Sequence, residues 1–126
     1  MEHVKLQETL EKNKQKYIDY LLKLVSIDTH DIGHGIEGGL EAKGQDFMAE
    51  VFTAMGAEKV EKDPLKEESI LKCKEKYREG NIGHNYDNRY NVYATFKGKS
   101  EKSILFNGHI DHMPAENEEH WIIPPL

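Results

Sequence analysis

The sequence predicts an α/β fold in which helices pack on a mostly buried sheet. Segments whose apolar residues recur at helical spacing are mixed with strand-like segments, in the order helix, helix, strand, helix, strand, strand. The chain has 126 residues, of which 37% are hydrophobic and 32% are charged. This length and composition allow one domain of modest size with a small core.

Two helices are predicted in the first half of the chain. Residues 4–25 are rich in helix-forming side chains, and their apolar residues gather at helical spacing toward the end of the segment. In residues 40–55, apolar side chains from Phe47 onward fall at i, i+1, i+4, i+5 and i+8, and Gly56 suits a left-handed helix stop. The intervening residues 30–39 contain too many glycines for regular structure and predict an exposed loop.

A short strand and a polar helix are predicted next. Residues 57–61 alternate between apolar and charged side chains, which favours a strand. Asp63 and Pro64 have the character of an N-cap and a first helical residue. They predict a helix over residues 65–79 that Gly80 closes.

Two more strands are predicted toward the end of the chain. In residues 91–96 the apolar side chains share one face, and the charged residues 97–102 suit a connection to the next strand. Residues 103–106 contain a continuous apolar run, the pattern of a strand buried on both faces.

Side chains of the metal-ligand type follow this predicted buried strand. In an extended segment His109 and Asp111 lie on the same face, about 6.6 Å apart along the chain. Open α/β sheets bind their ligands at the carboxyl ends of strands. A histidine that binds zinc through one ring nitrogen needs its other N–H fixed, and a carboxylate two residues along can accept that hydrogen bond if the backbone turns suitably.

The wider sequence around this pair resembles a known family. Residues 105–111, Leu-Phe-Asn-Gly-His-Ile-Asp, with Pro114, Trp121 and Pro124 after them, resemble the zinc aminoacylase and peptidase family that includes acetylornithine deacetylase and succinyl-diaminopimelate desuccinylase. Other segments resemble the amino-terminal part of that family in order and spacing: residues 17–25, residues 44–56, Arg89-Tyr90-Asn91-Val92 and Lys97-Gly98. Residues 108–111 are the most specific part of the resemblance.

The resemblance implies that residues 1–126 are the amino-terminal part of a zinc-dependent hydrolase catalytic domain. It implies a site with two zinc ions that cleaves the amide bond of small N-acyl amino acids or peptides, with His109 as a metal ligand and Asp111 as the supporting catalytic acid. Cobalt or manganese would also suit imidazole and carboxylate ligands. The family's bridging aspartate, general base, other zinc ligands and dimerisation segment match no position here, so we expect the isolated chain to be catalytically silent. The apolar residues 121–126 also predict a truncated chain.

Charge and hydropathy exclude several classes of partner. A net charge of −6 argues against binding to nucleic acid or to anionic membrane surfaces. No apolar run approaches the roughly 20 residues that span a bilayer, and the N-terminus lacks the apolar stretch of a signal peptide, so a cytoplasmic location is expected. The single cysteine, Cys73, offers neither an internal disulfide nor a cysteine-based zinc motif.

Two alternatives to the hydrolase remain open. One is a non-catalytic acidic binding module that uses the remnant of the same fold and its apolar end to bind a partner. The other is a structural metal protein that uses the histidines of the glycine-rich loop at residues 33–39. The acidic residues Glu116, Glu118 and Glu119 are interpreted as a solvated face rather than as a general base.

Overall fold

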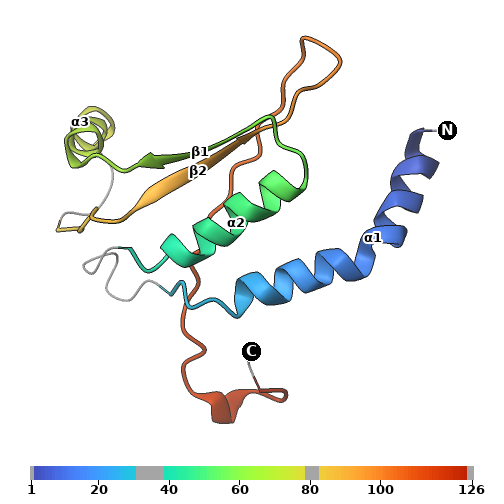
Figure 1. The fold of residues 1–126 in the computed structure, drawn as a ribbon. Helices are drawn as coiled ribbons and strands as arrows, with labels where there is room; N and C mark the ends of the chain where they lie inside the picture. The colour runs from blue at the N-terminus through green and yellow to red at the C-terminus, as the bar shows by residue number, and fades with distance from the viewer. Residues whose placement is uncertain (1, 31–38, 79–82, 125–126) are drawn as a thin grey trace. The chain divides into compact units, whose positions relative to one another are not determined.

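The computed structural model describes residues 2–30, 39–78 and 83–124 (Figure 1). Within these residues it is mixed α/β, with three α-helices, a two-stranded antiparallel sheet and one 3-10 helix. The chain divides into two compact units, one formed by Met1–Ile27 with Asn117–Leu126 and the other by Asp28–Glu116. Both His109 and Asp111 belong to the second unit.

The first unit contains α1 (Glu2–Val25), which confirms the first predicted helix. The backbone N–H of Ser26 makes the last α-helical hydrogen bond, to the carbonyl oxygen of Leu22 at 3.0 Å, and the N–H of Ile27 donates to Leu24, three residues back, at 3.1 Å. The same unit contains the 3-10 helix η1 (Glu118–His120), where the Asn117 side chain accepts a hydrogen bond from a backbone N–H and caps the turn. None of the described helices combines the length and the apolar character needed to cross a bilayer.

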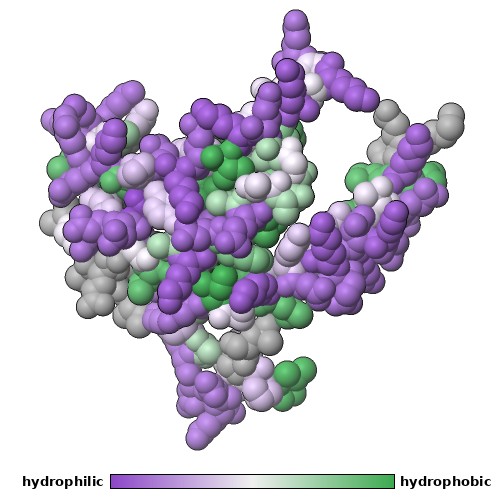
Figure 2. Space-filling model, in the orientation of Figure 1, coloured by the Kyte–Doolittle hydropathy of each residue, from purple (hydrophilic) through white to green (hydrophobic). Residues whose placement is uncertain are grey.

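The second unit is built around α2 (Ala42–Ala54), which packs on both strands of the sheet. This helix confirms the second predicted helix, and Gly56 adopts the expected left-handed conformation with φ of +86°. The buried hydrophobic residues of the described chain, Ala49 and Val51, both lie on it. Figure 2 shows apolar residues gathered over this region and bordered by polar ones.

The sheet consists of β1 (Lys59–Pro64) and β2 (Tyr90–Thr95), paired from Lys59 opposite Thr95 to Pro64 opposite Tyr90. The strand β2 confirms the prediction for residues 91–96 to within one residue. The prediction that Asp63 and Pro64 begin a helix is wrong, because both residues pair with β2. Proline is tolerated at this position since it lies at the end of the strand.

The helix α3 (Glu67–Tyr77) follows β1 and confirms the predicted polar helix, with a later start. Glu67 and Glu68 occupy its first turn and Lys74 and Lys76 its last, which complements the helix dipole. Arg78 adopts a left-handed conformation with φ of 56° at its end. The predicted stop at Gly80 lies outside the described residues, as do residues 31–38, which make up most of the predicted glycine-rich loop.

The prediction of a buried strand at residues 103–106 is wrong. This segment is irregular and pairs with no strand of the described chain. Ile104, Leu105 and Phe106 are 78%, 84% and 86% exposed. A strand buried on both faces needs neighbouring strands and a packed layer on each side, and the two-stranded sheet offers neither to this segment. The sheet itself is also not mostly buried, since Val60 is the only half-buried residue of β1.

Candidate functional site

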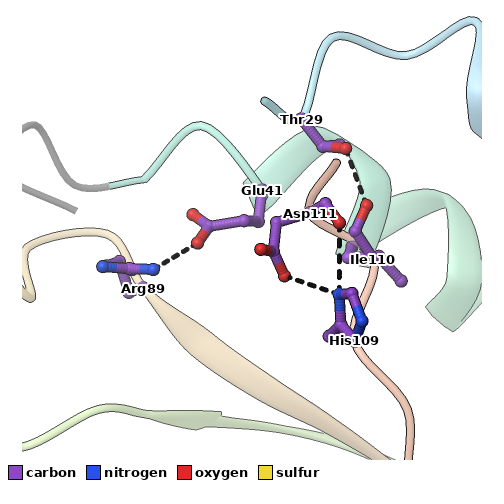
Figure 3. A network of polar contacts seen from close by, with 6 residues as sticks. All are labelled: Thr29, Glu41, Arg89, His109, Ile110 and Asp111. Atoms are coloured by element: carbon purple, nitrogen blue, oxygen red, sulfur yellow. Dashed lines mark hydrogen bonds and ion pairs between the residues drawn. The ribbon is translucent and has the colours of Figure 1, made fainter. Parts of the chain in front are cut away.

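His109 and Asp111 contact one another directly (Figure 3). Nδ1 of His109 lies 3.1 Å from Oδ1 of Asp111 and 3.2 Å from the carbonyl oxygen of the same residue. Both oxygens can only accept a hydrogen bond from the imidazole, so this geometry favours the tautomer that carries its proton on Nδ1. The other ring nitrogen, Nε2, is then the one with a lone pair for a metal ion. The His109 side chain is 84% exposed, so solvent and metal ions reach it.

A buried threonine forms a hydrogen bond with Ile110, the residue between His109 and Asp111. The hydroxyl of Thr29 donates a hydrogen bond of 2.8 Å to the carbonyl oxygen of Ile110, across 81 residues of sequence (Figure 3). Thr29 is completely buried. No motif or spacing in the sequence singles out Thr29, because its partner is distant along the chain and is a backbone atom.

The two residues beside Thr29 form a second polar contact. Nδ1 of His30 donates to the carboxylate of Asp28. This hydrogen bond lowers the pKa of Asp28, the charges of His30 and His112 act in the same direction, and together they outweigh the opposing effect of desolvation. The rings of His30 and His112 have their centroids 6.5 Å apart. His34, the other histidine of the predicted loop, lies outside the described residues.

An ion pair lies in the same region of the second unit. The guanidinium of Arg89 contacts the carboxylate of Glu41, and both side chains are largely buried (Figure 3). No local pattern in the sequence points to Glu41. Because a buried charge needs a partner, this pair constrains how the start of α2 meets the start of β2.

A tyrosine on β2 also forms hydrogen bonds with α2. The hydroxyl of Tyr90 contacts the carboxylate of Asp46 and lies 3.0 Å from the carbonyl oxygen of Ala42. Lys62, on β1, reaches the same carboxylate at 2.6 Å. Hydrogen bonds from Lys62 and Tyr90 lower the pKa of Asp46. Burial, then the hydrogen bond with Asp46 and its charge, raise the pKa of Tyr90 to about 12.

The described residues do not form a complete zinc site. Structural and catalytic zinc sites take about three or four protein ligands. Among the residues that the structure describes, no group of three or more His, Cys, Asp or Glu side chains could hold a metal ion. Cys73 is exposed on α3. The His109–Asp111 pair fits the geometry of one metal ligand and its supporting carboxylate. The described residues do not supply the further ligands that a complete site needs.

In comparisons with known proteins, no family model, curated protein or solved structure matches the chain.

Proposed function

We propose that this chain supplies a histidine ligand to a zinc-dependent hydrolase site that cleaves the amide bond of N-acyl amino acids or small peptides. The observation that supports the proposal is the contact between His109 and Asp111. It directs Nδ1 to the carboxylate and leaves Nε2 for a metal ion on a side chain that solvent reaches. The family resemblance of residues 105–111 supplies the reaction class.

In this proposal His109 and Asp111 have separate roles. His109 binds the metal through Nε2, and Asp111 keeps the proton on Nδ1, which orients the ring and makes the imidazole a better ligand. The chemistry that zinc would supply at a complete site is a water ligand with a pKa near 7, which would be a nucleophile at neutral pH. We propose two zinc ions in the complete site, with cobalt or manganese as metals that the same ligands accept.

The proposal also states what the isolated chain does. One imidazole with one supporting carboxylate binds zinc more weakly than a complete ligand set, and it does not position a substrate. We therefore propose that residues 1–126 alone bind zinc with low affinity and do not hydrolyse N-acetyl amino acids.

The test is a zinc titration of the metal-free chain in a calorimeter. It is made on the wild type and on two histidine variants. His109→Ala should weaken zinc binding by about 10-fold or more, since it removes the ligand. His120→Ala, in the exposed η1 turn, is the matched control and should bind zinc like the wild type. Equal zinc binding by His109→Ala and the wild type, or none by either, would overturn the proposal.

A second function is favoured by the exposed apolar segment at residues 104–106. Contiguous apolar surface of this kind often marks an interaction site, which suits a non-catalytic binding module. Two variants distinguish the two proposed functions. Under the hydrolase proposal His109→Ala loses zinc and Leu105→Asp retains it, whereas a binding module would lose its partner in Leu105→Asp and keep it in His109→Ala.

A further inference from the structure

Among the described residues of the second unit, the most buried side chain is a threonine and not an apolar residue. Thr29 is 0% exposed, while the apolar core residues Ala49 and Val51 are 9% and 7% exposed. Burying a hydroxyl without a partner is costly, so a buried threonine is kept where its hydroxyl has a defined acceptor. Here that acceptor is the carbonyl oxygen of Ile110, at 2.8 Å.

The position of this acceptor connects Thr29 to the candidate metal ligand. The carbonyl of Ile110 belongs to the peptide group that also contains the backbone nitrogen of Asp111. Because a peptide group is planar, holding its oxygen fixes the direction in which the chain enters Asp111. His109 in turn contacts two atoms of Asp111, the side-chain oxygen Oδ1 and the carbonyl oxygen. A shift of Asp111 therefore moves both acceptors of the His109 ring.

The rest of this segment lacks the hydrogen bonds of a regular element. Residues 101–116 form neither helix nor strand, so no ladder or helical bond fixes their backbone. The segment around Thr29 approaches them at a second point, where the ring of His30 lies 6.5 Å from that of His112. Residues 28–30 therefore flank the His109–Asp111 pair, and Thr29 makes the buried hydrogen bond between the two segments (Figure 3).

We propose that Thr29 is a positioning residue for the candidate zinc site: by holding the carbonyl of Ile110, it keeps Asp111 where it accepts the Nδ1 proton of His109 and so presents Nε2 to the metal. The role in metal binding rests on the proposed function. The effect on the tautomer of His109 does not, because it exists without a metal.

Two substitutions separate the hydroxyl from the shape of the side chain. Thr29→Val keeps the branched shape and removes the donor, whereas Thr29→Ser keeps the donor and removes a methyl group. The first measurement is the tautomer of the His109 ring in the metal-free chain, from the nitrogen-15 shifts of its two ring nitrogens. We expect the Nδ1-protonated form to dominate in the wild type and in Thr29→Ser. In Thr29→Val we expect a shift toward the mixture of an unconstrained imidazole.

The second measurement is zinc affinity in the same three proteins. We expect Thr29→Val to weaken binding by about 10-fold, within the range seen when the partner of a metal-binding histidine is lost. Thr29→Ser should stay within about 3-fold of the wild type, a rescue that a purely steric role for the side chain would not give.

The outcomes distinguish failure of this inference from failure of the proposed function. An unchanged His109 tautomer in a folded Thr29→Val protein overturns the positioning role. A wild type with the expected tautomer but no zinc binding overturns the proposed function and leaves the role of Thr29 in placing Asp111 standing. If Thr29→Val does not fold, a measurement of the Thr29 hydroxyl proton in the wild type tests the inference instead. A slowly exchanging Thr29 hydroxyl proton coupled to the Ile110 carbonyl carbon supports the inference, and rapid exchange with no coupling overturns it.

Discussion

Arg89, directly before β2, forms an ion pair with Glu41, directly before α2. Their side chains are only 16% and 12% exposed, and 48 residues separate them in the sequence. The pair therefore joins the start of the helix to the start of the strand on which it packs. Water screens it far less than it screens the ion pairs on the surface.

Glu41→Gln should destabilise the second unit, because it removes the negative charge that contacts the largely buried guanidinium of Arg89. We expect the free energy of unfolding to fall by about 2 kcal/mol, below the range for fully buried pairs because both side chains keep some exposure. Urea denaturation followed by circular dichroism measures the change. The matched control is Glu68→Gln, which removes the exposed i,i+4 pair with Lys72 and should cost less than about 0.5 kcal/mol. Equal effects of the two variants would show that burial does not strengthen the Arg89 pair.

Tyr90 should make the protein less stable at high pH. Its pKa is raised to about 12 in the folded chain, against about 10 for an unperturbed tyrosine. A raised folded pKa means that the unfolded state loses the proton first. The stability contribution is therefore complete below pH 10 and is lost as the pH rises from 10 to 12. Screening by solvent around Asp46 limits the loss to the order of 1–2 kcal/mol.

Tyr90→Phe is the variant that tests this pH dependence. It removes the titrating hydroxyl, so its free energy of unfolding should fall less between pH 10 and pH 12 than that of the wild type. In a spectrophotometric titration of tyrosinate, Tyr90→Phe should likewise lack the component that titrates at the highest pH in the wild type. Tyr93→Phe, on an exposed position of the same strand, is the control that should keep that component. Titration of all tyrosines near pH 10 in the wild type would contradict the prediction.

Leu105→Ala should have little effect on stability even though Leu105 lies in a continuous apolar run. Its side chain is 84% exposed, so truncation removes few packing contacts, and we expect a change within about 0.5 kcal/mol. Val51→Ala removes a side chain that is 7% exposed and should cost about 2 kcal/mol. A larger loss in Leu105→Ala than in Val51→Ala would show that residues 103–106 are buried, as the sequence pattern alone predicts.

Gly39→Ala should be destabilising for two separate reasons. Gly39 has φ of +90°, which disfavours any residue with a Cβ atom, and an added Cβ would lie 3.1 Å from Cβ of Asn88 and 3.3 Å from the carbonyl oxygen of Asp87. Gly56 has a similar φ of +86° with open space around it. Gly56→Ala should therefore cost about 1 kcal/mol from the backbone alone, and Gly39→Ala should cost more. Thermal unfolding of the two variants gives the comparison, and equal losses would exclude a steric contribution at Gly39.

The elements that could be predicted from the sequence are those fixed by local periodicity. The apolar spacing of α1 and α2 and the alternation of β2 are properties of neighbouring residues, so the pattern alone places them. The run at residues 103–106 has an equally clear pattern, but burial of a strand depends on what lies beside and above it, which no local pattern contains. Pro64 is a second example. Its local sequence suits a helix start, but its pairing with the distant Tyr90 makes it the end of a strand.

The candidate site divides in the same way. His109 and Asp111 are two residues apart, so extended periodicity is enough to predict that their side chains share a face, although the contact of 3.1 Å between them forms in an irregular segment. Glu41 and Thr29 contact partners that are 48 and 81 residues away, and neither carries a local signal. Prediction from one sequence therefore finds the proposed ligand and misses the long-range contacts of Glu41 and Thr29.

The separation between Thr29 and Ile110 also bears on the order of folding. Their hydrogen bond closes a loop of 81 residues, whereas the pairing of Pro64 with Tyr90 closes a much shorter one. The longer loop costs about 1 kcal/mol more in chain entropy, so the sheet has the advantage of forming first. The bond from Thr29 would then be made after the transition state for folding. In that case its loss in Thr29→Val would speed unfolding and leave the folding rate almost unchanged.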